Sequence, residues 1–112
     1  MSQYFILWKL NSSLPPPQEP SMQVMQTEGF LALMRHQLTD GVLKEVQGFL
    51  QGDRGYAITK ENATEEQVYK ELQSWLPWVE FEVHRTIPFP KAIEITLEVQ
   101  KARAQMMQKV PA

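Results

Sequence analysis

A helical pattern that stops at a proline and gives way at once to an alternating strand is the feature that most constrains this chain. After Pro77, apolar residues occupy every second position at Val79, Phe81 and Val83. Side chains of a strand point alternately to its two faces, so the intervening residues share the opposite face. That opposite face carries Trp78, Glu80, Glu82, His84 and Thr86. The pattern predicts a strand over residues 78–87 with one apolar face and one face of ionisable groups.

Apolar periodicity and turn residues divide the rest of the chain. Gln3 to Leu10 is dense in aromatic and aliphatic residues, as in a strand buried on both faces. Asn11 to Pro20 contains four prolines and is expected to be an exposed connection or a lid. The expected elements are strands at 3–10, 42–50, 56–60 and 78–87, and helices from 21 to 39, from 65 to the residue before Pro77, and from 91 to 109.

The first helix is expected to begin with Ser21 as its N-cap and to stop at Asp40-Gly41. Its buried stripe is predicted from steps of three and four and comprises Val24, Thr27, Leu31, Met34 and Leu38. Residues 62–64 are expected to cap the second helix, whose buried stripe comprises Val68, Leu72 and Trp75.

The order β-α-β-β-α-β predicts an α+β, ferredoxin-like fold in a single domain over residues 1–112, with residues 91–109 as a C-terminal helical extension. In this fold two helices cover one face of a four-stranded antiparallel sheet and leave the other face bare. The length of 112 residues leaves room for one hydrophobic core and no separate regulatory domain.

The first strand is apolar on both faces, which indicates self-association. Phe5 and Leu7 occupy one face, and the other carries Tyr4, Ile6, Trp8 and Leu10. The face without helices would therefore expose an apolar patch that monomers seldom tolerate. We expect a homodimer, or a larger homo-oligomer, packed sheet to sheet as a dimeric α+β barrel. The alternative is that the C-terminal helix folds back and covers this face within one chain.

Charge and cysteine content exclude several classes of protein. Eleven basic and thirteen acidic residues give a net charge of −2, without the basic stripe of a nucleic-acid-binding protein. The absence of cysteine excludes disulfides, thiolate catalysis and cysteine-bound zinc. The start of the chain lacks the pattern of a signal peptide, and the longest apolar run, at residues 4–8, is too short to span a bilayer. We expect a cytoplasmic protein with neither nucleic-acid nor membrane partners.

The segment at residues 76–83 reads Leu-Pro-Trp-Val-Glu-Phe-Glu-Val and resembles the Phe-Pro-Tyr-x-x-Ile-Glu-Val segment that leads into the last strand of muconolactone isomerases. Three other segments are similar to the same family: the early loop at Leu14-Pro15, Asp40-Gly41 before a strand, and Gly-Tyr-Ala-Ile at 55–58. The resemblance covers most of residues 3–88. It implies the dimeric α+β barrel superfamily, in which two sheets join across a dimer and enzymes act on small organic molecules.

Departures from the family patterns limit what can be transferred. The YCII-related proteins of the superfamily carry a His early in the first helix and an Asp before the Pro-aromatic pair. Here the helix reads Met-Gln-Thr-Glu at 25–28, and Leu76 precedes Pro77. From the isomerase segment, Glu82 alone matches directly. Muconolactone isomerisation moves a proton next to a carbonyl, so a relative would need a carboxylate or imidazole base.

The candidate catalytic residues are therefore Glu82, His84 and Glu80. When two carboxyl groups lie close together in a dry site, the charge of one raises the pKa of the other, which then keeps its proton. A neighbouring imidazole can share that proton. Two alternatives remain open: a solvated face that protects a sheet edge, and a metal site, for which a fourth ligand is lacking. Candidate substrate-binding residues are Trp78, Trp8 and Tyr56, although large aromatic residues are more often core or interface residues.

Two classes of function follow from these observations. The first is a cofactor-free isomerase or lyase that acts on a small organic molecule, in a pocket between sheet and helix or inside the barrel. The second is a non-catalytic ligand-binding or assembly module. No cofactor and no metal are expected in either class. A cavity that encloses Glu82 and another polar group would favour the enzyme.

Overall fold

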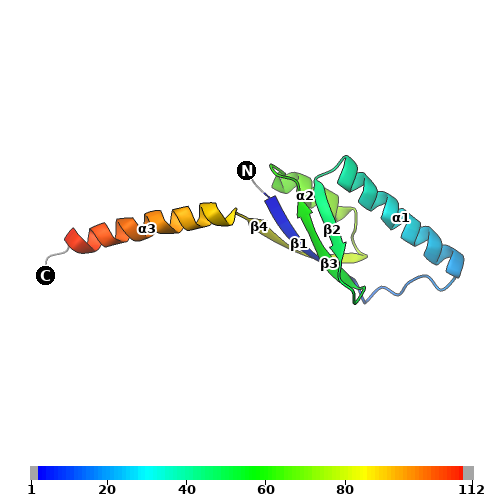
Figure 1. The fold of residues 1–112 in the computed structure, drawn as a ribbon. Coiled ribbons are helices and arrows are strands. Elements are labelled where there is room, and N and C mark those ends of the chain that lie inside the picture. Colours follow the sequence, from blue (N-terminus) through cyan, green and yellow to red (C-terminus); the bar gives the residue numbers. More distant parts are fainter. Residues whose placement is uncertain (1–2, 110–112) are drawn as a thin grey trace.

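The computed structural model describes residues 3–109 and has an α+β architecture of four strands and three helices (Figure 1). The elements in chain order are β1 (Gln3–Leu10), α1 (Pro20–Thr39), β2 (Leu43–Gly48), β3 (Arg54–Thr59), α2 (Glu65–Gln73), β4 (Val79–Thr86) and α3 (Phe89–Lys109). The type of every element agrees with its prediction, and the boundaries differ by a few residues.

The four strands form one antiparallel sheet in the order β2-β3-β1-β4. This order, with α1 and α2 against one face, is compatible with a ferredoxin-like fold. The last strand begins at Val79 and ends at Thr86, which makes it shorter than the predicted 78–87. β2 is also shorter than predicted, and its pairing with β3 shifts register between Leu43 and Glu45.

α2 is capped within the predicted range of residues 62–64. Thr64 is the N-cap and accepts a hydrogen bond from the backbone N–H of Gln67, whose side chain accepts in return from the backbone N–H of Thr64. Glu65 and Glu66 lie in the first turn, where the positive end of the helix dipole favours carboxylates. Two backbone donors at the helix start are thereby satisfied.

The predicted start and buried stripe of α1 are partly wrong. Its N-cap is Glu19 without a side-chain cap, and Ser21 lies inside the helix because Pro20 presets the first helical turn. Met34 and Leu38 face the sheet, whereas Val24 and Leu31 are 55% and 41% exposed. The N-terminal half of α1 extends past the end of the sheet (Figure 1), so no surface formed by residues 3–109 covers it.

The hydrophobic core lies between the sheet and the two helices that cover it. Its buried members are Tyr4, Ile6, Leu43, Ala57, Ala63 and Val68. Thr59 is fully buried among them, and its hydroxyl accepts a hydrogen bond from the backbone N–H of Tyr4 at 2.9 Å. Even-numbered residues of β1 thus face the helices, and Phe5 and Leu7 face the side without helices.

α3 leaves the end of β4 and projects along the long axis of the molecule, away from the sheet (Figure 1). It begins at Phe89, two residues earlier than predicted, because a proline such as Pro90 fits the first turn of a helix. The radius of gyration is 20.7 Å, whereas a compact domain of this length has about 13 Å. The alternative in which this helix covers the open sheet face within one chain does not hold in this structure.

Candidate functional site

The three candidate catalytic residues share one strand face, as the alternation predicts, and this is the sheet face without helices. In the register of β4 with β1, Glu80 is opposite Lys9, Glu82 is opposite Leu7, and His84 is opposite Phe5. Trp78 does not share this face. It precedes the strand and packs edge to face on Phe30 of α1, with 5.8 Å between ring centroids.

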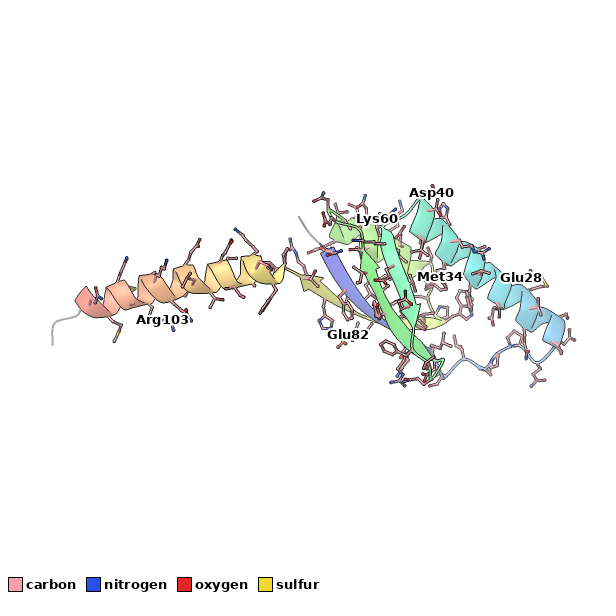
Figure 2. The ribbon with its side chains drawn as sticks, in the orientation of Figure 1. Glu28, Met34, Asp40, Lys60, Glu82 and Arg103 are labelled. Carbon is pink, nitrogen blue, oxygen red and sulfur yellow. The ribbon has the colours of Figure 1, made fainter. Side chains whose placement is uncertain are left out.

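Two of the three residues are in contact with each other. Nε2 of His84 lies 3.3 Å from Oε2 of Glu82, whereas Oε2 of Glu80 lies 3.7 Å from Nζ of Lys9. Glu82 is on the side of the sheet away from α1, and its side chain is 65% exposed (Figure 2). The side chains of Glu80 and His84 are also more than half exposed. In the single chain this face is wet, and Glu82 with His84 forms the one close acid–imidazole pair on it.

Aromatic residues run across the same open face beside the charged strand. The rings of Phe5 and Tyr56 stack with centroids 5.6 Å apart, and the ring of Phe49 lies 6.2 Å from that of Tyr56. A shallow hollow between this row and β4 is lined by Leu7, Lys9, Phe49, Arg54, Glu80 and Glu82. The open face therefore combines an apolar row with a charged border.

One ion pair, between Asp53 and Arg54, lies at the hairpin end of this hollow. Nε of Arg54 donates to Oδ1 of Asp53 at 3.1 Å, and Nη2 donates to Oδ2 at 3.2 Å. The hydrogen bonds from the guanidinium lower the pKa of the Asp53 carboxyl and raise the pKa of Arg54. Both side chains are about half exposed, so this pair marks the hairpin and not a desolvated site.

A second concave site lies on the opposite, helix-covered face of the sheet. It is a partly enclosed cavity of about 180 Å³ between α1, the end of α2 and all four strands. Its walls are the side chains of Ile6, Trp8, Leu10, Phe30, Met34, Leu43, Val46, Ala57, Leu72, Trp75, Val79 and Phe81. Met34 marks the α1 wall, across the sheet from Glu82 (Figure 2). No charged side chain lines this cavity.

The polar atoms of the two tryptophans in the cavity wall are already satisfied. Nε1 of Trp75 donates to Oε1 of the buried Gln37 at 2.8 Å, and Nε2 of Gln37 donates to the backbone carbonyl of Glu71 at 3.0 Å. Nε1 of Trp8 donates to the backbone carbonyl of Tyr56 at 3.3 Å. The cavity therefore presents ring faces and aliphatic groups, which suit an apolar molecule.

The predicted substrate-binding residues are not brought together. Trp8 lines the cavity, with its ring over Gly55, where an added Cβ would come within 2.5 Å of the indole. Tyr56 lies on the open face, and Trp78 lies outside the cavity wall. Phe30 lines the cavity but was not among the predicted residues, although its spacing of four from Met34 places both on one helix face.

The described part of the chain holds no group of three or more His, Cys, Asp and Glu side chains that could bind a metal ion. Glu82 and His84 supply two such ligands, and Glu80 is turned to Lys9. Within residues 3–109, none of the helices combines the length and apolarity needed to cross a bilayer.

Searches of the known protein-family models and of the curated proteins find no match to this chain. The resemblance to muconolactone isomerases therefore stays a hypothesis based on the residues at 76–83.

Proposed function

We propose that this protein binds a small, neutral, apolar organic molecule in the cavity between the helices and the sheet. The observation that carries the proposal is the cavity itself, about 180 Å³ in volume and lined by apolar side chains from six elements or their ends. Concave apolar sites of this kind are the usual places for small ligands.

The volume limits the size of the ligand. An engineered apolar cavity of roughly 150 Å³ in another protein binds benzene, whereas drug-sized ligands occupy roughly 300–1,000 Å³. A single ring or a short branched hydrocarbon is the size that fits. An empty cavity of this volume lowers the free energy of unfolding by about 4 kcal/mol, at about 24 cal/mol per Å³. Typical domains have a free energy of unfolding of only about 5–15 kcal/mol. A ligand that fills the cavity offsets that cost.

The lining limits the charge of the ligand. A carboxylate or an ammonium group placed here would lose its hydration without gaining a partner, because the nearest indole N–H groups are already bonded. Glu82 and His84 lie on the other face of the sheet and do not contact this cavity. Binding without catalysis is therefore the reading that the cavity supports.

The test is calorimetric titration with toluene as the probe. We expect saturable binding by the wild-type protein and progressive loss in Ala57→Val and Ala57→Leu, because residue 57 lines the cavity and a larger side chain fills it. Glu82→Gln is the matched control and should bind as the wild type does. Circular dichroism checks that each variant is folded. Absence of toluene binding, or equal binding by folded Ala57→Leu, would contradict the proposal.

A second candidate function is proton transfer by Glu82 and His84, and their 3.3 Å contact is the observation that favours it. This function requires the open face to be covered, as in the homodimeric α+β barrel that the resemblance implies. The row of Phe5, Tyr56 and Phe49 gives that face an apolar surface suited to such packing.

The proton-transfer candidate is tested by exchange of the proton next to the carbonyl of an unsaturated lactone in deuterated water, followed by NMR. Glu82→Gln should abolish any exchange that the wild type catalyses, and His84→Asn should reduce it. Glu80→Gln is the matched control, because Glu80 faces Lys9. Wild-type exchange no faster than in buffer would remove this candidate and leave the cavity proposal unaffected.

A further inference from the structure

Two helices of this chain are apolar and exposed, and they lie at opposite ends of the molecule (Figure 1). α3 extends from one end of the sheet, and the N-terminal half of α1 overhangs the other. The apolar face of an amphipathic helix is normally packed against another surface. α3 and the N-terminal half of α1 therefore lack a partner surface within residues 3–109.

Six polar residues of α3 form one stripe, because they follow one another at steps of three and four: Lys91, Glu94, Glu98, Lys101, Gln105 and Gln108. Apolar rows flank this stripe on both sides. One row comprises Ile95, Val99, Ala102 and Met106, and the other comprises Phe89, Ile93 and Leu97. Apart from Ala102, whose side chain is small, these residues are between 41% and 75% exposed. By its helical spacing, Arg103 lies between the two rows, on the side opposite the polar stripe, and the uncharged Thr96 and Gln100 lie on the same side.

The overhanging half of α1 is similar in character. Residues 20–29 contain a single charged side chain, Glu28. Its neighbours one helical turn away include Val24, Met25 and Leu31, which are 55%, 70% and 41% exposed. Each helix thus presents an apolar surface with one charge in it, and the two charges are of opposite sign. Within residues 3–109, neither Glu28 nor Arg103 has an ion-pair partner.

The exposed area matches what a stable dimer needs. The chain exposes 8843 Å², whereas a compact monomer of 13.0 kDa exposes about 6,300 Å². The excess of roughly 2,500 Å² per chain is as large as the surface that each partner loses in obligate homodimers, whose interfaces bury about 2,000–5,000 Å² in total.

We infer that α3 of one copy packs on the outward face of α1 of a second copy, with Arg103 paired to Glu28 of the partner subunit. A two-fold axis perpendicular to the long axis reverses the direction of the molecule and brings α3 of each copy to the overhang of the other. The two copies of the α3–α1 contact then form together, as the two-fold symmetry of a dimer requires. The inference does not depend on any ligand in the cavity.

Charge reversal tests the proposed pairing in the full chain. Light scattering after size exclusion should give a dimer for the wild type at micromolar concentration, and a 13.0 kDa monomer would overturn the inference. Glu28→Arg and Arg103→Glu should each raise the dimer dissociation constant by about tenfold or more, because each leaves like charges together in the interface. The double variant should recover most of the affinity. Lys101→Glu, on the polar stripe of α3, is the matched control and should have little effect.

Cysteine cross-linking separates this contact from other arrangements, and the chain has no cysteine of its own. A mixture of Glu28→Cys chains and Arg103→Cys chains should form disulfide-linked dimers under mild oxidation, and neither variant alone should do so. Dimers formed by Arg103→Cys alone would mean that α3 pairs with α3 and would overturn the inference. A monomeric link within the double-cysteine variant would mean that α3 packs on its own α1, with the same consequence. These substitutions are at exposed positions, and circular dichroism verifies the fold.

Discussion

The two faces of the sheet differ in what they offer a ligand. The helix-covered face carries Ile6 and Trp8 beside a cavity with apolar walls, and the open face carries the ion pairs of Lys9 with Glu80 and of His84 with Glu82. The alternation of side chains along β1 and β4 produces both the apolar face and the charged face, because successive side chains of a strand point to opposite faces. The charged residues predicted to be catalytic and the apolar cavity therefore lie on opposite sides of one sheet.

The largest expected effect is on the free energy of unfolding, and it is seen by comparing two neighbours on β1 whose side chains point to opposite faces. Ile6→Ala removes a side chain that is 1% exposed and should lower the free energy of unfolding by about 2–5 kcal/mol. Leu7→Ala, on the open face, should cost about 1 kcal/mol in the monomer. Urea denaturation at several protein concentrations measures both. A cost for Leu7→Ala that grows with concentration would show that the open face is covered by a second copy.

A smaller effect is expected where α2 supports the entry to β2. Both carboxylate oxygens of Glu71 accept from the backbone N–H of Val42, at 2.9 and 3.0 Å. Glu71→Ala would leave this donor without its partner and should cost about 1–3 kcal/mol. The neighbouring Lys70→Ala is the control, since Lys70 is exposed. Equal thermal midpoints for the two variants would mean that the helix-covered face does not depend on this link.

The cap of α2 should contribute less. Thr64→Ala removes the side-chain acceptor for the backbone N–H of Gln67 and should cost about 1 kcal/mol. Thr96→Ala is the matched change in α3, where the hydroxyl donates to the backbone carbonyl of Ala92 one turn back. Hydrogen bonds from a hydroxyl to the carbonyl one turn back add little to helix stability. The thermal midpoint of Thr96→Ala should therefore stay near that of the wild type. A larger loss for Thr96→Ala would contradict this ranking.

The smallest effect concerns the hairpin on the open side. The pKa of Asp53 is lower in the folded chain, chiefly because Arg54 donates a hydrogen bond to the carboxylate. The associated stabilisation is therefore present above the pKa of Asp53 in the unfolded chain and is lost as the pH falls through its pKa in the folded chain. NMR titration should show that Arg54→Ala raises the pKa of Asp53. An unchanged titration would mean that the pair does not persist in solution.

Local patterns explain why the elements were predictable. Thr64 with Gln67 defines a helix start through contacts three residues apart, and the alternation from Val79 to Val83 defines a strand and its two faces. A pocket between sheet and helix was one of the two predicted locations, but its volume and its lining were not predictable, because both depend on how far α1 stands from the sheet. Likewise, the spacing that includes Val24 and Leu31 indicates a helix and cannot show that this half extends past the sheet edge.

The most direct test of ligand binding on the helix-covered face uses the indole N–H signals of the three tryptophans in a ¹H–¹⁵N NMR titration with toluene. Each signal is assigned from a single Trp→Phe variant. Trp8 and Trp75 line the cavity and Trp78 does not. The account predicts that the signals of Trp8 and Trp75 shift saturably with the same dissociation constant, and that the signal of Trp78 shifts least. Static indole signals, with shifts confined to Tyr56 and His84 on the open face, would contradict it.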